Sequence, residues 1–556
     1  MTKFNKPLIT VTRVLGAVQA TASRMTPKLG PSPFGNMAKC RTPTTQVSCT
    51  INTPQIRSIC TTNSSYLLSR SCVSLHHRQR SYSTQQFDPF LPSSNPYGPQ
   101  KGDHITLALS GGVDSSVCAL LLSRSNLYSL SAVFMRNWNT LDESSSFEPG
   151  SGGSMGCEWQ RDWEDVQKVC RHLGNIPVEL MDLSKEYWTQ VWEPALVGWS
   201  EGVTPNPDVG CNKEIKFGKL MERVLFSSAC SSFAISSRIS ASSPSSTTVG
   251  RGEELWGVRK PKKWLATGHY ANISYTKDQG RPKLMRAKDP SKDQTYYLSS
   301  VPERSLSHAC FPLGNLFKSQ VRSLARQFDL PTSEKSESMG ICFIGTRQSD
   351  SRKGVSNKDG FSSFLNEYIC LKQGNIVDGD TRKVVGSHQG LHTFTVGQGA
   401  RISGSKSKYY VARKDTIKNE IVVVKGKFHP MLMCSSLHVK QIDWIWNHPP
   451  KQLLQPSPTS LQVEEQGKIE EKGDQVSNPK IKLLAQVRHR QTEVECLVYR
   501  KESNGEKGGY TIEFVNNPVL AVAPGQILAL WKGSWCLGSG VISSVKTLWD
   551  DEQLQQ

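Results

Sequence analysis

The chain has 556 residues, of which 37% are hydrophobic and 21% are charged, a globular composition with room for about two to four domains. No apolar run approaches the roughly 18 to 20 residues that cross a bilayer, so the sequence excludes a membrane-spanning helix and we expect no membrane partner. The fifteen cysteines form no Cys-x-x-Cys pair, which argues against a zinc ribbon or a thioredoxin-like motif, and we predict no metal-ligating cluster.

The first 87 residues differ sharply in composition from the rest of the chain. They contain eleven Lys or Arg and no Asp or Glu, which leaves +8 of the formal charge of +19 for the remainder. An Arg- and Ser-rich, acid-poor terminus is typical of an organelle transit peptide, and RQRSYST (Arg78 to Thr84) resembles a mitochondrial processing site. We therefore predict import into the mitochondrial matrix and cleavage near Tyr82 or Ser83. A disordered basic tail is the alternative.

The organised sequence begins near residue 100 with HITLALSGGVDSSVCALLLSR. A short buried strand is expected at Ile105 to Leu109, and Val117 to Leu122 form the apolar face of a helix. The two glycines of the intervening turn let backbone N–H groups converge on an anion at the helix amino terminus, but no Walker lysine follows them. The residues predicted to cradle phosphate are Ser110, Gly111, Gly112, Val113, Asp114, Ser115 and Ser116.

Further segments continue an α/β pattern. Strands are expected at Leu130 to Trp138, at Pro177 to Met181 and within Lys262 to Ile273, where a Gly-His turn occurs. Between the first two, Val166, Val169, Cys170 and Leu173 form a helical stripe. Alternating strands and helices predict a doubly wound parallel sheet with ligands at the carboxyl ends of its strands.

Two cysteines stand in distinctive surroundings. In TPNPDVGCNKEIKF, a rigid double-proline approach precedes Cys211, and the following apolar positions predict a helix. Cys211 is thus expected at or just before a helix amino terminus beside Lys213 and Lys216, features that favour a thiolate. In SESMGICFIG, glycines flank Cys342, which by itself reads as a structural residue.

Six stretches in this order, LSGGVDSSV, FMRNW, TPNPDVGCNKEIKF, ATGHYA, KDQTYYL and GICFIG, closely resemble the tRNA-specific 2-thiouridylases of the ATP pyrophosphatase superfamily. The resemblance extends from about Ile105 to Trp531 and implies the mitochondrial form. It implies an ATP-dependent sulfurtransferase that adenylates the 2-oxygen of the wobble uridine and replaces this oxygen with sulfur from a cysteine persulfide. It also implies an α/β ATP pyrophosphatase domain with a doubly wound parallel sheet, a small α+β central domain and a C-terminal β-barrel.

The expected domain boundaries follow from this resemblance and from composition. The leader is 1–87, and three polar or Ser-rich tracts, at 226–252, 346–360 and 454–479, are predicted to be solvated insertions on the scaffold. The domains are 100–350 for catalysis with an insertion at 226–252, 360–430 for a central tRNA-binding domain, and 435–548 for the barrel with an insertion at 454–479.

The resemblance also implies roles for individual residues. Cys211 would be the nucleophile, Cys342 the persulfide carrier, and the two would form a disulfide during turnover, with Asp208 beside them. The implied ligands are ATP with Mg²⁺, tRNA and a persulfide sulfur donor protein. Besides the phosphate cradle, ATP would contact Met135 and Gly268. The residues expected at the target base are Asn206, Pro207 and Asp208. Those expected elsewhere on tRNA are His269, Lys292, Asp293, Gln294, Arg488, His489 and Gln526.

Several of these positions have plainer readings. His269 would serve equally as a core or capping histidine, and Asp293 as a turn cap. The basic run from Arg488 to Arg490 would serve as the solvated face of an exposed strand. The stretch TVGQGARISG departs from the family, since members usually place an arginine directly after the Gln, and here Gly399 follows Gln398.

Rival function classes share only parts of this pattern. Another pyrophosphate-loop ligase or synthetase would need the SGGVDSS turn but not two thiols. Thiolases for other tRNA positions often carry Cys-x-x-Cys pairs or an iron–sulfur cluster, and a non-enzymatic tRNA-binding module would need no phosphate loop.

Overall fold

The computed structural model describes residues 95–138, 158–226, 259–337, 357–453, 479–500 and 508–555. The chain divides into the units Met1–Ser83 and Thr84–Gln556, and the description concerns the second. The predicted leader, Cys342 and most of the insertions 226–252 and 454–479 lie outside the described residues. Within the described residues, every helix is too short or too polar to cross a bilayer.

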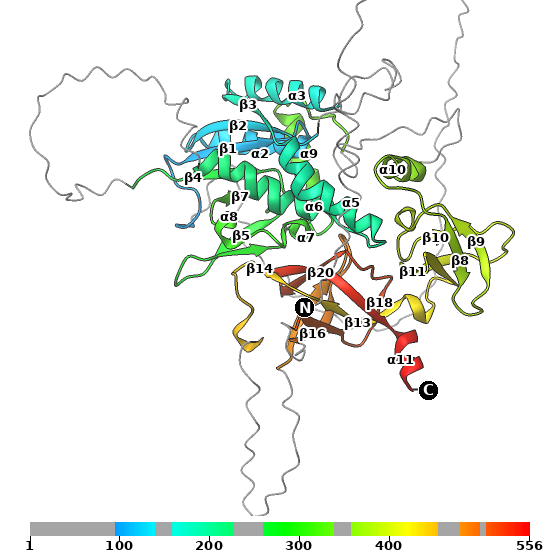
Figure 1. Cartoon of the computed structure of the whole chain (residues 1–556). Helices are drawn as coiled ribbons and strands as arrows, with labels where there is room; N and C mark the ends of the chain where they lie inside the picture. The colour runs from blue at the N-terminus through cyan, green and yellow to red at the C-terminus, as the bar shows by residue number, and fades with distance from the viewer. Residues whose placement is uncertain are drawn as a thin grey trace, which may run out of the picture. The chain divides into compact units, whose positions relative to one another are not determined.

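A five-stranded sheet forms the centre of the first domain (Figure 1). Its order is β3-β2-β1-β4-β7, and every neighbouring pair is parallel. In the register, Ile105 pairs with Leu130 on one side and with Trp264 on the other. The predicted parallel sheet is confirmed. Its strands are β1 (His104–Leu109), β2 (Ser129–Arg136), β3 (Val178–Asp182), β4 (Lys263–Thr267) and β7 (Ala309–Cys310).

Helices cover one face of this sheet. Helix α2 (Val113–Ser125) follows β1 directly and packs in one cluster with β1 and α3 (Glu158–His172). The expected helical stripe is confirmed, since Val166 and Cys170 of α3 are buried in this cluster. On its other side α2 packs against α9 (Lys318–Gln327).

Aromatic residues dominate the core of the opposite face. There Val133 and Leu265 of the sheet join a cluster with Trp192, Ile215 and Phe217. Because helices lie on both faces, the sheet is doubly wound, as predicted. The helical segments of this side are α4 (Ser184–Tyr187), η1 (Trp188–Trp192), α5 (Glu193–Ser200), α6 (Pro207–Gly210), η2 (Cys211–Leu220) and η3 (Glu222–Phe226).

The first domain ends in shorter elements. The hairpin of β5 (Asn272–Tyr275) and β6 (Pro282–Met285) follows β4, and α7 (Thr295–Leu298) and α8 (Glu303–Leu306) precede β7 and α9.

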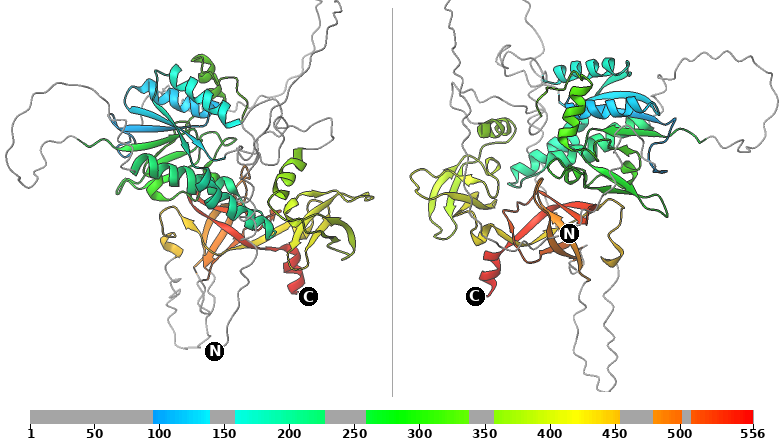
Figure 2. Two further views of the ribbon diagram at one scale, coloured as in Figure 1. Left: turned by 45° about the horizontal axis from the view of Figure 1, so that its top comes forward. Right: turned by 180° about the vertical axis from the view of Figure 1, so that it is seen from behind.

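The central domain begins with α10 (Asn357–Asn366) and continues as a five-stranded sheet. Its order is β10-β11-β12-β8-β9, and Figure 2 shows its strands as one curved layer. Val411, Ile421 and Val423 are fully buried between its strands. The strands are β8 (Gly374–Asp378), β9 (Val384–His388), β10 (Gly399–Ala400), β11 (Tyr409–Asp415) and β12 (Glu420–Lys425), with 3₁₀ turns η5 (Leu391–Thr393) and η6 (Pro430–Leu432).

The C-terminal domain is a closed antiparallel barrel, as predicted. Strand β13 pairs with β17 on one side and with β20 on the other, which closes the ring β13-β17-β16-β15-β19-β20. Strand β20 also extends to β6 of the first domain, where Trp535 pairs with Met285. The elements are β13 (Met433–Val439), β14 (Asp443–Trp444), η7 (Lys451–Leu453), β15 (Ile481–Gln486), β16 (Val494–Arg500), β17 (Tyr510–Phe514), β18 (Val519–Leu520), β19 (Ile527–Lys532), β20 (Trp535–Thr547) and α11 (Leu548–Gln555).

Candidate active site

The predicted phosphate cradle is a strand-turn-helix junction. Strand β1 ends at Leu109, and α2 begins at Val113 after the turn. Gly111 has φ +73°, and a Cβ at this position would lie 2.6 Å from the carbonyl oxygen of Asp162. Side-chain hydroxyls brace the turn, since Ser115 and Ser116 both donate to the Gly112 carbonyl, at 3.0 and 2.9 Å. The first-turn N–H groups of α2 are therefore held in the arrangement that binds an anion.

Gly268 lies directly against this cradle. It follows β4, the neighbour of β1 in the sheet, and a Cβ at Gly268 would lie 2.8 Å from the Ser115 nitrogen. The chain leaves β1 toward β2 on one side while β4 lies on the other, so this point is the topological switch where doubly wound sheets bind ligands. The structure thus brings Gly268 together with Ser110 to Ser116, and half-buried Met135 lies near the carboxyl end of β2.

Asp114 on the first turn of α2 has a cationic partner that the sequence analysis missed. Lys318 Nζ lies 2.7 and 2.8 Å from the two carboxylate oxygens of Asp114, and 3.2 Å from Glu337 Oε1. Tyr270 also donates its hydroxyl to Asp114, at 2.8 Å. Lys318 is the first residue of α9. A lysine is disfavoured at the amino terminus of a helix because the helix dipole is positive there. A lysine at this position therefore indicates that an anionic group lies nearby to stabilise it.

The helical segment that contains Cys211 begins before this residue, at Pro207, and not at Cys211 as expected. Asn206 caps α6, its Oδ1 accepts from Val209 N at 3.4 Å, and Pro207 occupies the first helical position. Proline suits this position because its φ is fixed near the helical value and it has no N–H to satisfy. The π-helix η2 continues from Cys211. The prediction that Cys211 lies at a helix amino terminus was therefore wrong, since the helical segment begins four residues earlier.

Cys211 is buried, with 7% of its surface exposed. Asn137, the residue after β2, donates from Nδ2 to Cys211 Sγ at 3.7 Å. Within the described residues, no two cysteines are joined to each other by a disulfide. Lys213 is shared between Asp443 at 2.8 Å and Glu214 at 3.5 Å, so carboxylates offset its charge.

Lys216 acts on two predicted site residues. Burial raises the pKa of Asp208, and the Lys216 charge opposes this rise. Burial, together with Lys216, holds the pKa of His269 well below its usual range. His269 is 8% exposed, and its Nδ1 lies 2.7 Å from Thr267 Oγ1. A tRNA contact of His269 stays a prediction.

The three neighbouring residues expected on tRNA have partners inside the fold. Asp293 accepts from Arg286 Nη1 and Ala287 N, both at 2.8 Å, and it also accepts from a threonine hydroxyl. Gln294 Oε1 accepts from Tyr270 N at 2.9 Å. Lys292, which is partly exposed, pairs with Glu337 at 2.6 Å.

The predicted tRNA residues of the barrel lie in turns. Arg488 to Arg490 follow β15 in a turn, because β15 ends at Gln486, so the expected exposed strand was wrong. Arg488 Nη2 donates to the Ala521 carbonyl at 2.9 Å, and the His489 ring lies 4.5 Å from that of Tyr297.

Gln526 joins the barrel to the segment that precedes Asn206. Its Nε2 donates to the Thr204 carbonyl, and the Thr204 nitrogen donates to the Pro524 carbonyl, both at 2.9 Å. The backbone of Thr204 is therefore fixed from both sides by one turn of the barrel.

Comparisons with known proteins match this architecture. Three family models align in order: a tRNA methyl transferase HUP domain at 103–237 and 257–346, a tRNA methyl transferase PRC-barrel domain at 362–425, and an Aminomethyltransferase beta-barrel domain at 435–542. The chain is 35% identical over 441 residues to the tRNA-specific 2-thiouridylase MnmA of Chlamydia felis, covering 79% of this chain and 96% of that protein. The chain belongs to the tRNA-specific 2-thiouridylase family. A second member, MnmA 2 of Aliarcobacter butzleri, is 35% identical over 457 residues, covering 80% of this chain and 100% of that protein.

Solved structures give weaker likenesses. The U34-tRNA thiolase NcsA of Methanococcus maripaludis matches with 14% identity and a TM-score of 0.24, covering 48% of this chain and 67% of the other. A 4-thiouridine synthetase in complex with RNA and ATP matches with 15% identity and a TM-score of 0.21, covering 48% and 53%. At these TM-scores the likenesses carry no conclusion about this family member.

The contact of Gly268 with α2 yields a testable prediction. In Gly268→Ala the new methyl group would press on Ser115 N and displace the cradle. Overpacking of about 1–3 kcal/mol corresponds to a loss of roughly 5- to 150-fold in affinity, which calorimetric titration with ATP would measure. Gly98→Ala is the matched control, because its Cβ would meet only Asn95 O, at 3.7 Å. Unchanged ATP affinity in Gly268→Ala would separate Gly268 from the nucleotide site.

Proposed function

We propose that this protein is an ATP-dependent tRNA 2-thiouridine synthase. It adenylates the 2-oxygen of the wobble uridine and replaces this oxygen with sulfur from a cysteine persulfide. The observation that carries the proposal is the 3.7 Å contact between Asn137 Nδ2 and Cys211 Sγ. Asn137 follows β2 directly, and β2 pairs with β1, whose end carries the phosphate cradle. A buried thiol and a cradle for triphosphate therefore lie at the same edge of one sheet.

This pairing favours sulfur transfer over the methyl transfer that the family models' descriptions mention. Moving a methyl group requires neither cleavage of a triphosphate nor a buried thiol beside it. Sulfur insertion requires both, because the carbonyl oxygen must be turned into a leaving group and sulfur must be handled by thiol chemistry. The 2-thiouridylase names of the Chlamydia felis and Aliarcobacter butzleri relatives support the same choice.

Activation of the uridine begins in the cradle. The 2-carbonyl oxygen attacks the α-phosphate of ATP, the bond to the β-phosphate breaks, and pyrophosphate leaves. The N–H groups of the first turn of α2 would hold the phosphates, and Lys318 would lie beside them through its contact with Asp114. The base must leave its stack to reach this site, and the segment Asn206 to Asp208 would bind the extruded uracil.

Magnesium fits the residues present. Mg²⁺ prefers oxygen ligands and is commonly held by one or two carboxylates together with substrate phosphates. The Asp114 carboxylate, one third of whose side chain is exposed beside the cradle, provides such a ligand. When bound, the ion would neutralise charge on the phosphate oxygens.

Sulfur transfer would use both thiols. The outer sulfur of a persulfide on Cys342 attacks C2, and AMP leaves with the former uridine oxygen. The Cys211 thiolate then attacks the Cys342 sulfur, so that a Cys211–Cys342 disulfide forms and the base departs as the thiocarbonyl. A thiol reductant must supply two electrons to restore both thiols, and a persulfide donor protein must reload Cys342. Donation from Asn137 Nδ2 would stabilise the Cys211 thiolate.

The two thiols can be separated experimentally. We expect Cys342→Ser to abolish persulfide loading and 2-thiouridine formation but to retain ATP and tRNA binding. Cys211→Ser should still load Cys342 and should accumulate tRNA linked to it through a disulfide, because nothing resolves the adduct. Mass spectrometry of protein and of digested tRNA after incubation with ATP and a persulfide donor measures each step.

Cys370→Ser is the control for these variants, since Cys370 is an exposed, free cysteine. It should retain full thiolation. Full thiolation by a folded Cys211→Ser or Cys342→Ser protein would contradict the proposal, and persulfide found only on Cys211 would reverse the two roles.

We further propose that the protein works in the mitochondrial matrix after cleavage within the leader 1–87, near Tyr82 or Ser83. The absence of acidic residues and the eleven basic residues in this leader support import. Amino-terminal sequencing of the endogenous protein should find a terminus near Tyr82 or Ser83. A terminus at Met1 in a cytosolic fraction would contradict this location.

A further inference from the structure

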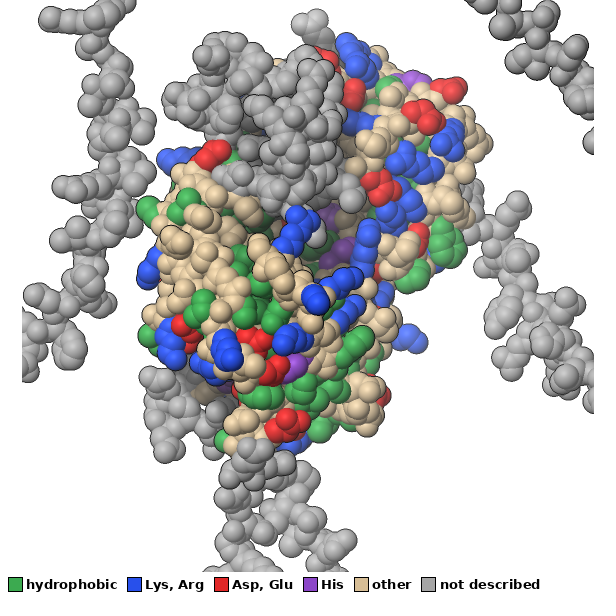
Figure 3. Space-filling model, turned by 90° about the vertical axis from the view of Figure 1, so that its right-hand side faces the viewer, with side chains coloured by type: hydrophobic (Ala, Val, Ile, Leu, Met, Phe, Trp, Pro, Cys, Tyr) green, Lys and Arg blue, Asp and Glu red, His purple; other side chains and the backbone are tan. Residues whose placement is uncertain are grey.

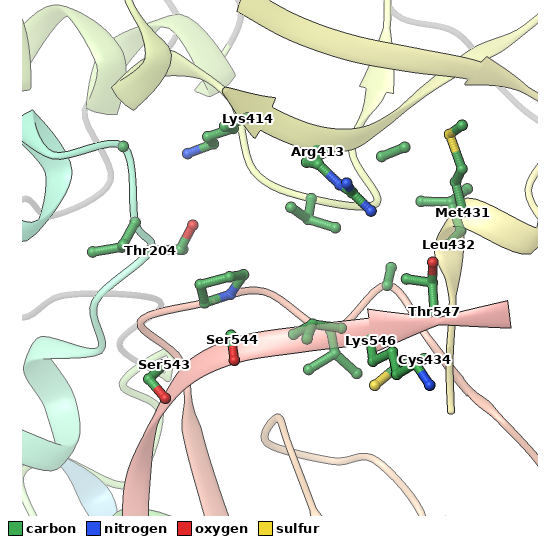
Figure 4. Close-up of a pocket in the computed structure, with 18 of the residues that line it drawn as sticks. Thr204, Arg413, Lys414, Met431, Leu432, Cys434, Ser543, Ser544, Lys546 and Thr547 are labelled. Carbon is green, nitrogen blue, oxygen red and sulfur yellow. The ribbon is translucent and has the colours of Figure 1, made fainter. Parts of the chain in front are cut away.

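A cavity of about 390 Å³ lies where three parts of the chain meet, away from the cradle residues. Thr204 of the first domain forms one end, and β11 of the central domain forms one side. Figure 4 shows Arg413 and Lys414 on that side and Ser543 and Ser544 on β20 across from them. Nothing in the proposed chemistry uses this cavity.

Two of its three cations are already compensated. Arg413 Nη2 lies 2.7 Å from Asp550 Oδ1, and Lys546 forms an ion pair with Asp551. The remaining carboxylate of the lining belongs to Glu201, an exposed residue at the end of α5. Of the three cations that line the cavity, Lys414 is therefore the one for which no ion pair is found among the described residues.

Lys414 is half-buried, and its ammonium group has no partner among the described residues. Its Nζ is shielded from solvent, and within the described part of the chain it has neither a hydrogen-bond acceptor nor a carboxylate within ion-pair distance. Burial lowers the pKa of Lys414 to about 8, so the group is still mainly protonated at neutral pH. Burial, together with the Lys414 and His388 charges, also lowers the pKa of His392. A buried ammonium without a counter-ion is unfavourable, and an anion in the cavity would relieve it.

The position of the cavity indicates which kind of anion it binds. Thr204, which lines it, lies two residues before Asn206, and its backbone is fixed by Pro524 and Gln526 of the barrel. A ligand in the cavity would therefore contact the same backbone that presents the proposed base-binding segment. Besides Lys414, the lining offers hydroxyl groups, which suit the oxygens of a phosphodiester. Figure 3 shows a hollow on one face of the molecule with Lys and Arg side chains beside it and some Asp and Glu among them.

We propose that this cavity binds a backbone phosphate of the tRNA and that Lys414 is its counter-ion. The inference rests on the proposed function, because it assigns a second contact to the same substrate. Binding there would fix the RNA strand relative to the segment Asn206 to Asp208. Lys414 is then a positioning residue, because it acts on the placement of the substrate and not on the reacting atoms.

The test compares the full-length variants Lys414→Met and Lys418→Met. Methionine keeps most of the side-chain volume and removes the charge, and Lys418 is an exposed control in the turn after β11. tRNA affinity is measured at several salt concentrations, with ATP affinity and Tm alongside. We expect Lys414→Met to weaken tRNA binding about tenfold and to reduce the slope of log K against log salt by roughly 0.7–0.9, the value for one phosphate contact. ATP affinity should not change, Tm should not fall, and Lys418→Met should behave as the wild type.

Unchanged affinity and slope in Lys414→Met would overturn the inference. If inorganic phosphate raises the Tm of the wild type but not of Lys414→Met while tRNA binding is unaffected, the cavity takes free phosphate, and the RNA contact is overturned. Should Lys414→Met fail to fold, Lys414→Gln is measured in the same way. A salt slope equal to that of the wild type in Lys414→Gln would then overturn the inference, and a reduced slope would support it. The 2-thiouridine assay on the wild type is independent of these slopes, so failure of the inference is distinguishable from failure of the proposed function.

Discussion

The parallel pairing of β1 with β2 and β4 is the constraint on which the site depends. Parallel strands end at one edge of a sheet, so this pairing places the turn after β1, Asn137 after β2 and Gly268 after β4 side by side. Gly268 then leaves no room for a side chain against α2, and Asn137 reaches the Cys211 thiol. The cradle and the residue that contacts the thiol are neighbours because they follow neighbouring strands.

The barrel completes this arrangement from outside the first domain. Strand β20 continues the hairpin of β5 and β6, and Arg286 of the first domain pairs with Asp293 and with Glu493 near the start of β16. Pro524 and Gln526 fix Thr204, so the segment before Cys211 is held by two domains at once. The part of the barrel expected to contact RNA is therefore hydrogen-bonded to the backbone next to the segment expected to bind the target base.

Local patterns predicted the sheet and the cradle because their causes are local. Apolar runs of strand length and two glycines before a helix are sufficient for β1, α2 and the turn between them. The resemblance to 2-thiouridylases supplied the barrel and the domain order. The pairing of Asp114 with Lys318 joins residues 204 positions apart, and no spacing rule connects them. The turn at Arg488 to Arg490 likewise depends on where β15 stops pairing with β16. Cys342 and the leader lie outside the described residues, so their roles stay predictions.

The account centres on activation of the uridine oxygen by ATP at the end of β1. The direct measurement uses tRNA whose wobble uridine carries ¹⁸O at position 2, incubated with the protein, ATP, a persulfide donor and a thiol reductant. The account predicts one ¹⁸O atom in each AMP formed, pyrophosphate free of label, and one 2-thiouridine for each AMP. AMP without the label, or ¹⁸O appearing in orthophosphate or water, would contradict it, because the uridine oxygen would then have left by another route.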